Sequence, residues 1–325
     1  MSGRLLDIMQ QHSLQRISFI DVAKATCIIL MVIGHWAENE MLITYIYSFH
    51  MPALLIISGY LYRSHSLTKT VLGFLIPIII FSLFNLMVKI LIGELKMTEI
   101  SFHYAFFGIF HYRYGLGDGL FMGDWFIWAL IGLRMLFGDI KELGFIRHYY
   151  LQIAFACVIY MTLESYLIEI NSLFRGYYIG LMIPSLPFFC TGLFLKNKGW
   201  RSHHVSYKFI IPLLLCSVFI PLLNGHCSIN SHLYGQSYLI FFMNAIISTM
   251  TLFILSAKIP NSKYIVTISK GTFVILGTHM PILQTLEYLF PRKIYFLFPI
   301  ITVTICYYLI IICEKYYPIL LGKWR

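Results

Sequence analysis

Long apolar runs separated by short polar connections make up most of the chain. A helix that crosses the hydrocarbon core of a bilayer needs about 20 mainly apolar residues. Windows of that kind occur at residues 17–36, 42–62, 71–93, 120–138, 149–168, 178–195, 208–223, 236–256, 271–290 and 294–313. The pattern predicts an all-α, polytopic membrane helical bundle with about ten transmembrane helices. A further apolar stretch, residues 102–110, is too short to span and is expected to be interfacial or re-entrant.

Composition supports a membrane protein and excludes an ordinary soluble enzyme. Of the 325 residues, 59% are hydrophobic and only 12% are charged, whereas soluble domains carry about 25% charged residues. We expect a single membrane domain over residues 1–325, with a cytoplasmic lead (1–16) that is not cleaved, a transmembrane bundle (17–313) and a cytoplasmic tail (314–325). In such a chain the net charge of +10 bears on membrane orientation and lipid contact, and we expect no nucleic-acid partner.

The positive charges are distributed unevenly among the predicted loops. If the N-terminus is cytoplasmic, 17 of the 24 Lys and Arg residues lie on the cytoplasmic side and five on the outer side, and Lys24 and Lys89 remain inside spans. The connection at 226–236 has two histidines but no Lys or Arg, which fits an outer loop. Because cytoplasmic loops are enriched in Lys and Arg, the distribution predicts an N-in/C-in topology.

The cysteines give no sign of a disulfide framework. There are seven, an odd number, and six of them lie in apolar segments, where a free thiol behaves as a small hydrophobic group. We expect neither disulfides nor a metal site.

The first apolar segment contains two ionisable residues, Lys24 and His35. Such residues are costly in a membrane span and therefore indicate function. Their separation of eleven residues is close to three helical turns, which places them on one helix face about 16 Å apart. This pattern is typical of a base and an anchor for a long anionic substrate. The alternative is that Lys24 reaches the inner interface and His35 only accompanies the interfacial Trp36.

Two nearby residues extend this candidate site. Glu38, three residues after His35, shares its helix face if the helix continues, and we expect it to hold the imidazole in one tautomer. His50, about two turns below the outer surface, is expected at a depth near that of His35. Pro52 lacks a backbone donor and permits a kink just after His50. The alternative for His50 is a histidine that is hydrogen-bonded within the bundle.

Several of these segments together resemble a known family. Lys24, ten spacer residues and His35 are followed by FHMPALLIISGY at 49–60 and DWFIWAL at 124–130, with weaker likeness in LPFFCTG at 186–192 and SKGTFVILGTHMPI at 269–282. The combination resembles the integral-membrane acyltransferase 3 family over nearly the whole chain. The resemblance implies a bundle of about ten helices that transfers acetyl or related groups from cytoplasmic acyl-CoA to sugar hydroxyls across the membrane.

The resemblance also assigns roles at matching positions. His35 matches the essential histidine of the family, Lys24 matches the basic partner that meets the acyl donor, and His279 matches a further histidine. One segment departs from the pattern. Relatives carry several basic residues before the proline of the third span, whereas SLTKTVLGFLIP at 66–77 has only Lys69. This departure leaves the identity of the acyl group open.

Residue chemistry and resemblance lead to one mechanistic hypothesis. Lys24, Lys69 and Arg134 hold the phosphates of acyl-CoA, most simply acetyl-CoA, near the cytoplasmic surface. His35 acts either as a general base on the acceptor hydroxyl or as a transient acyl carrier. Four residues are expected to contact the substrate, namely His50, Asp124, Trp125 and His279. The alternative for Asp124 and Trp125 is that they are an ordinary interfacial Trp and its polar neighbour, without contact to the substrate.

The expected activity is therefore membrane O-acylation of a cell-envelope glycan or lipid-linked sugar in a bacterial cytoplasmic membrane. A secondary transporter for a lipid-linked sugar or small anion is the alternative, with His35 and His279 as proton relays. Against it, the later half of the chain has no counterpart of the helix with Lys24 and His35. A catalytically inactive scaffold is disfavoured, because it would keep costly ionisable groups without a use.

Overall fold

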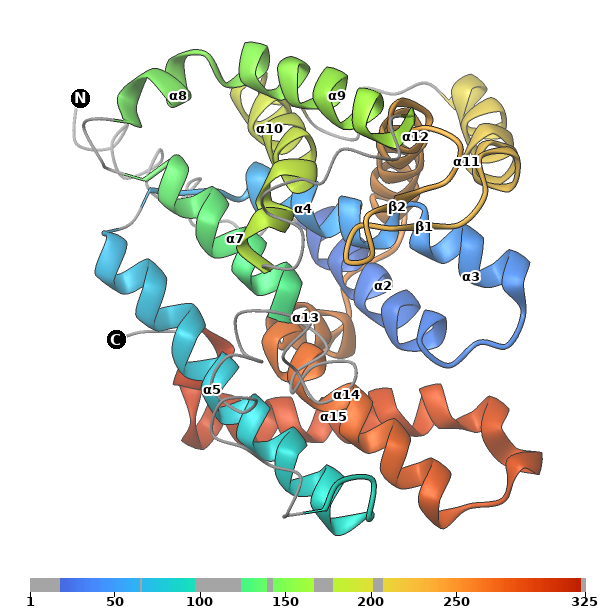
Figure 1. Cartoon of the computed structure of the whole chain (residues 1–325). Coiled ribbons are helices and arrows are strands. Elements are labelled where there is room, and N and C mark those ends of the chain that lie inside the picture. The colour runs from blue at the N-terminus through green and yellow to red at the C-terminus, as the bar shows by residue number, and fades with distance from the viewer. Residues whose placement is uncertain are drawn as a thin grey trace.

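The protein is described from a computed structural model, over residues 18–64, 66–96, 124–138, 143–166, 178–200 and 207–322. These residues are almost entirely helical (Figure 1), so the predicted all-α class is confirmed, and each of the ten predicted windows contains a helix. The apolar stretch at 102–110 lies outside the described residues. The α-helices are α2 (Ser18–Gly34), α3 (Glu40–Tyr47), α4 (His50–Tyr60), α5 (Leu67–Leu91), α7 (Asp124–Leu136), α8 (Gly144–His148), α9 (Tyr150–Tyr166), α10 (Met182–Asn197), α11 (Ile210–Asn224), α12 (Tyr238–Ser256), α13 (Lys263–Lys270), α14 (Thr272–Leu289) and α15 (Phe298–Tyr316).

Short elements complete the described fold. The 3-10 helices of the described residues are η4 (Tyr178–Leu181), η6 (Tyr207–Phe209), η7 (Arg292–Leu297) and η8 (Pro318–Leu321). Two short antiparallel strands, β1 (Cys227–Ser228) and β2 (Leu233–Tyr234), form a hairpin between α11 and α12. The predicted outer loop at 226–236 is thus an ordered hairpin over much of its length.

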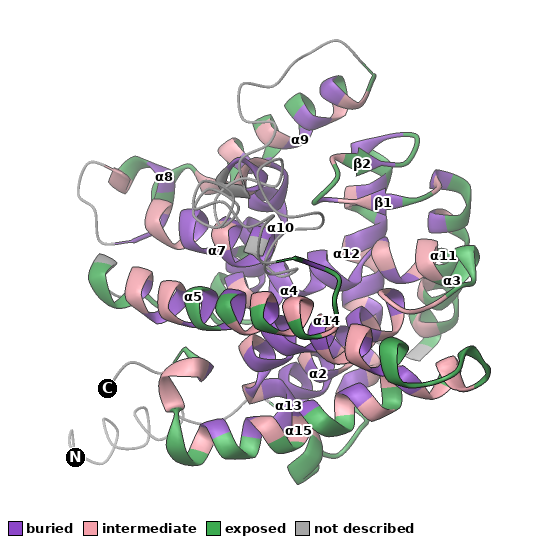
Figure 2. Ribbon diagram, turned by 60° about the horizontal axis from the view of Figure 1, so that its bottom comes forward, coloured by how far each residue is buried: buried purple, intermediate pink, exposed green. Residues whose placement is uncertain are grey.

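Helix α2, which contains Lys24 and ends one residue before His35, lies in the interior of the bundle. It packs against α3, α4, α12, α13, α14 and α15, and most of its residues are buried. Figure 2 shows the same for α4 and α14, while exposed residues concentrate on α5, α9, α11 and α15. A buried hydrogen bond from the Ser269 hydroxyl to Asp21 Oδ1 (2.6 Å) joins α2 to α13. The candidate catalytic helix is therefore held from several sides.

The second predicted span is broken into α3 and α4, which end and begin on either side of Ser48 and Phe49. The sequence suggested a kink at Pro52, just after His50. The structure has the break before His50 instead. Pro52 falls in the first turn of α4, where its missing N–H would have had no helical acceptor. The proline therefore begins a new helix rather than bending an existing one.

Helices α4 and α10 approach each other through glycine. A Cβ atom placed on Gly59 would lie 2.0 Å from the carbonyl oxygen of Phe189, and one on Gly192 would lie 2.0 Å from that of Ile56. Only glycine allows two helix backbones to come this close, as in membrane helix pairs generally. This contact fixes α4, and with it His50, against the core.

The ninth predicted span has a sharp bend at its start. Helices α13 and α14 meet at 84°, with Gly271 between them. A Cβ atom at Gly271 would lie 2.2 Å from the side chain of Ile310 on α15, so the bend depends on a residue without a side chain. The bend sets the direction of α14 and therefore the position of His279 beside α2.

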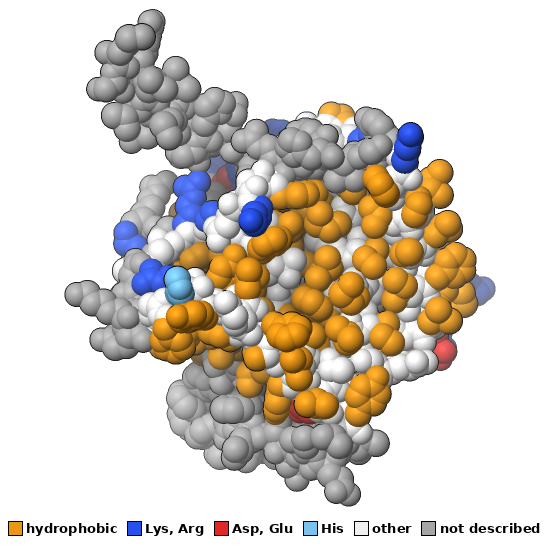
Figure 3. All heavy atoms as spheres, turned by 90° about the horizontal axis from the view of Figure 1, so that it is seen from above, with side chains coloured by type: hydrophobic (Ala, Val, Ile, Leu, Met, Phe, Trp, Pro, Cys, Tyr) orange, Lys and Arg blue, Asp and Glu red, His pale blue; other side chains and the backbone are white. Residues whose placement is uncertain are grey.

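The outer helices present apolar side chains to their surroundings, as expected for a multi-pass membrane protein. Among the described residues, four segments are long and apolar enough to cross a membrane, namely Glu40–Tyr60, Thr68–Leu91, Tyr238–Ser256 and Arg292–Tyr316. The bent pair α13 and α14 counts as a fifth if it forms one span. Hydrophobic side chains cover much of the face in Figure 3. Exposed examples on α9 and α11 are Phe155, Leu163, Ile211, Phe219 and Leu223. The count of ten spans and the N-in/C-in topology stay predictions.

Candidate active site

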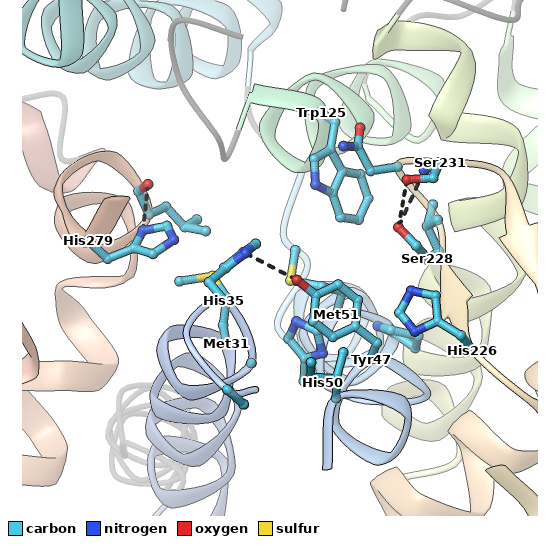
Figure 4. Close-up of a pocket in the computed structure, with 17 residues that line it drawn as sticks. Met31, His35, Tyr47, His50, Met51, Trp125, His226, Ser228, Ser231 and His279 are labelled. Carbon is cyan, nitrogen blue, oxygen red and sulfur yellow. Dashed lines mark hydrogen bonds between the residues drawn. The ribbon is translucent and has the colours of Figure 1, made fainter. Parts of the chain in front are cut away.

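A cavity of about 380 Å³ lies at the end of α2, and four histidines line it. His35 follows α2, His50 begins α4, His279 lies in α14, and His226 precedes the hairpin. Figure 4 shows their side chains around one space, with Tyr47 and Trp125 among them. The structure thus brings together four of the residues that the sequence nominated, namely His35, His50, Trp125 and His279.

His35 is positioned by the last turn of α2 and by Tyr47. Its N–H donates to the Met31 carbonyl (3.0 Å), which continues the helical pattern past Gly34. Its Nδ1 and the Tyr47 hydroxyl lie 3.1 Å apart in a hydrogen bond (Figure 4). A Cβ on Gly34 would approach the Tyr47 ring to 3.1 Å, so this glycine lets Tyr47 come close. The bond at Nδ1 and the last turn of α2 together fix the orientation of the imidazole.

His50 and His279 share one arrangement. Each is buried, and each places Nδ1 on the backbone carbonyl four residues earlier, Ile46 at 2.7 Å and Ile275 at 2.8 Å respectively. A carbonyl oxygen only accepts hydrogen bonds, so Nδ1 carries the proton and Nε2 has a lone pair. The buried Nε2 of His279 has no hydrogen-bond partner among the described residues. Both rings therefore offer an acceptor to the site.

The rings lie close enough to act together. The ring centroids of His35 and His279 are 5.2 Å apart, and the Tyr47 ring is 5.2 Å from that of His50 and 5.4 Å from that of His226. Tyr47 therefore contacts three of the four histidines through its ring or hydroxyl. It is the central side chain of the cluster.

Glu38 is not brought to the His35 ring, contrary to the expectation from spacing. Helix α2 ends at Gly34, so the helix does not continue as the shared face required. The Glu38 carboxylate is exposed and lies 3.9 Å from the guanidinium of Arg292. The side chain that is hydrogen-bonded to the His35 imidazole is Tyr47, not Glu38.

The three expected donor-binding residues lie away from the pocket lining. Lys24 is half-buried in α2, about three turns before His35. Lys69 is exposed in the first turn of α5, and Arg134 is half-buried in the last turn of α7. The guanidinium carbon of Arg134 lies 5.2 Å from the ring centroid of Phe74 on α5, so Lys69 and Arg134 share one end of the α5–α7 pair.

The same end of the bundle is held together by hydrogen bonds between helix termini. The Tyr62 hydroxyl donates to the Phe137 carbonyl (2.6 Å), and Lys196 donates to the Tyr62 carbonyl. These contacts join the ends of α4, α7 and α10. The buried Nε of Arg134 has no hydrogen-bond partner within the described part of the chain. An anion at this end would meet Lys69, Arg134 and Lys196.

The structure describes the side chain of only one of the two residues expected to contact the acceptor, Asp124 and Trp125. Trp125 is buried in the first turn of α7, and its indole lines the pocket (Figure 4). Asp124 begins α7, but its side chain lies outside what the structure describes. The interfacial explanation of Trp125 does not fit a side chain that is only 8% exposed.

The hairpin supplies a wall of the pocket that sequence reasoning did not assign to the site. His226, Ser228, Ile229, Asn230 and Ser231 line the cavity opposite His279 (Figure 4). The sequence signal was present, because two histidines and several turn-forming residues occur in GHCSINSHLYG at 225–235. Tyr47 had no comparable signal, because it ends α3 and is separated from His50 by the break between α3 and α4. Within residues 18–322 as described, no three His, Cys, Asp or Glu side chains are placed to hold a metal ion.

The fold and site define a multi-pass, helical membrane protein with a histidine-lined interior pocket. A family model described as an acyltransferase domain matches residues 17–313. The chain belongs to the acyltransferase 3 family and is a membrane acyltransferase, which confirms the family assigned from the sequence motifs. No curated protein and no solved structure matches the chain in the corresponding comparisons.

Proposed function

We propose that this protein transfers an acyl group, most simply acetyl, from cytoplasmic acyl-CoA to a hydroxyl of a cell-envelope glycan or lipid-linked sugar in the bacterial cytoplasmic membrane. The observation that carries the proposal is the pairing of His35 with Tyr47 in a pocket shared by His50 and His279. Membership of the acyltransferase 3 family supplies the reaction class.

In the proposed mechanism His35 is the general base. In the tautomer that this mechanism uses, Nδ1–H donates to the Tyr47 oxygen and Nε2 takes the proton of the acceptor hydroxyl. The hydroxyl oxygen attacks the thioester carbon, the C–S bond breaks, and the CoA thiolate takes the proton from the imidazolium. The products are an ester and CoA with a free thiol, so atoms and charge balance. The nearby ring of Tyr47 keeps the imidazole in one orientation throughout.

The substrates approach from opposite ends of the bundle in this proposal. The CoA phosphates bind where Lys69 and Arg134 meet at the ends of α5 and α7, and Lys24 lies between that surface and His35. Arg is suited to phosphate because its guanidinium donates two parallel hydrogen bonds. The acceptor enters beside the hairpin, where the Nε2 atoms of His50 and His279 accept hydrogen bonds from sugar hydroxyls and Trp125 packs against a sugar face.

The test is acyl transfer by purified protein in liposomes, with radiolabelled acetyl-CoA and an extract of lipid-linked glycans. His35→Ala is expected to lower CoA release and glycan labelling by at least about 100-fold, the lower end of what a general base contributes. His148→Ala is the matched control, because His148 is exposed on α8, and it is expected to retain native rates.

Two results would contradict the proposal. Native rates in His35→Ala would exclude His35 as the base, and a folded native protein that consumes neither acetyl-CoA nor longer acyl-CoAs would exclude acyl-CoA as donor. The transport of a lipid-linked sugar would then be measured in the same liposomes. If an acyl group is found covalently bound to His35 after rapid quenching, His35 acts as an acyl carrier and not as a general base.

A further inference from the structure

A second cavity, of about 280 Å³, is lined by other residues of the same hairpin. Its lining comes from the end of α9 and from the hairpin. His226 lines both cavities, so they adjoin at this side chain. The proposed mechanism makes no use of the second cavity.

The lining of the second cavity suits a neutral, hydroxyl-rich ligand. Glu164 is buried, with 8% exposure, and its carboxylate accepts hydrogen bonds from hydroxyl groups. Ser165 and His232 offer further polar groups, and Tyr234 adds an aromatic ring beside its hydroxyl. The described lining residues include no Lys or Arg, so they offer no countercharge to a phosphate or other anion. A carboxylate can accept hydrogen bonds from sugar hydroxyls, and an aromatic ring can pack against the apolar face of a sugar.

The hairpin is held in place by Asn224 at the end of α11. The Asn224 amide donates to the Tyr234 carbonyl (2.9 Å) and to the Cys227 sulfur (3.2 Å), and its Oδ1 accepts from the Ser237 N–H (3.3 Å). Gly235, at φ 66°, would place a Cβ 2.2 Å from the Asn224 carbonyl oxygen, so glycine is required there. The wall between the cavities is therefore preformed.

From this geometry we propose that the second cavity binds the sugar residue next to the one that is acylated. The acceptor is then an oligosaccharide of at least two units, with one unit in each cavity and His226 between them. The inference rests on the proposed function, because it takes the histidine pocket as the place of the reacting sugar. It goes further in making Glu164 and the hairpin determinants of acceptor length.

The test compares acceptors of different length. A panel of methyl hexopyranosides and of disaccharides made from the same hexoses is supplied with acetyl-CoA, and kcat and KM are measured for each. The native enzyme is expected to favour its best disaccharide over the matching monosaccharide at least tenfold in kcat/KM. Glu164→Gln is expected to bring this ratio close to one by raising the KM for the disaccharide. Glu40→Gln, at an exposed carboxylate in the first turn of α3, is the control and retains the native ratio.

A second variant separates recognition from folding. His232 has φ 53°, a conformation that Asn also adopts readily, so His232→Asn removes the imidazole without straining the hairpin. It is expected to lower the ratio in the same direction. The inference is wrong if the native enzyme has the same kcat/KM for disaccharides and monosaccharides. It is also wrong if both variants keep the native ratio, or if they lower kcat/KM equally for the two kinds of acceptor. If the native protein acetylates neither these sugars nor the lipid-linked glycans, the proposed function fails and this inference fails with it.

Discussion

Tyr47 holds one of the two ring nitrogens of His35. The ring has two nitrogens, and a hydrogen bond to one of them fixes the role of the other. Nδ1 of His35 lies 3.1 Å from the Tyr47 hydroxyl, while His50 and His279 direct Nδ1 to carbonyls of their own helices. Nδ1 is therefore hydrogen-bonded in all three rings, although the partner that holds it differs.

Removal of the Tyr47 hydroxyl tests this arrangement. Tyr47→Phe retains the ring contacts with His50 and His226 and removes only the hydrogen bond to His35. Since one hydrogen bond contributes about 0.5–1.5 kcal/mol, kcat is expected to fall roughly two- to tenfold with little change in the KM for acetyl-CoA. The pH dependence of kcat is expected to shift as well, because the hydrogen bond from Tyr47 affects how readily the imidazole takes up a proton. An unchanged kcat and pH profile would show that Tyr47 only packs against the ring.

At this scale the sequence predicted the histidines better than their partners. His35, His50 and His279 stand out as polar residues in apolar segments, where their cost indicates use. Tyr47 is one of 23 tyrosines and has no such signal by itself. Glu38 was expected to be the partner of the His35 imidazole on the assumption that the helix continues beyond His35. This was wrong, because α2 ends at Gly34.

Among the elements, α4 has the most exacting position. Its start places His50 in the pocket, and its later turns contact α10 through Gly59 and Gly192. Because each glycine faces a backbone carbonyl of the other helix, an added methyl group cannot be accommodated by a side-chain rotation. The helices would have to move apart, which would displace His50 from Tyr47.

Gly59→Ala is therefore expected to destabilise the protein by about 1–3 kcal/mol, the usual cost of overpacking. Gly144→Ala is the control, since a Cβ at Gly144 meets no atom within 4 Å, and surface changes of this kind stay within about 0.5 kcal/mol. The measurement is thermal unfolding of both variants in the same detergent. Equal stability of the two variants would mean that α4 and α10 are not in close backbone contact.

The elements also show what a hydrophobicity pattern leaves out. The windows located the helices because spanning segments need length and apolarity. They did not reveal that the second window is two helices, or that α13 meets α14 at 84°. Both breaks occur within continuously apolar or mixed sequence, where packing against neighbouring helices decides the backbone. Pro52 suggested a kink, but its place in the first turn of α4 removes the reason for one.

For the whole molecule, the main prediction is its orientation in the membrane. The distribution of Lys and Arg gives N-in/C-in, which puts the hairpin outside and the ends of α5, α7 and α10 inside. This orientation matches the proposed entry of the glycan beside the hairpin and of acyl-CoA near Lys69 and Arg134. A reversed orientation would put both substrates on the wrong sides.

Single cysteines test the orientation. Cys216, the exposed cysteine among the described residues, is first replaced by Ser. In intact cells a membrane-impermeant maleimide is then expected to label Asn230→Cys in the hairpin, but Lys198→Cys after α10 only once the membrane is opened. Both positions are exposed in the structure. The opposite labelling pattern would reverse the topology and the proposed substrate routes.

The hairpin has one further consequence, which concerns oxidation. Cys227 lies at its base, fully buried beside the Asn224 amide, and burial raises the pKa of its thiol to about 12. Since only the thiolate reacts readily with disulfides and oxidants, almost none of the reactive form exists near neutral pH. The wall of the pocket can therefore face an oxidising compartment without a cross-link or a sulfenic acid forming at Cys227. The hairpin keeps its shape through an amide contact rather than through a covalent bond.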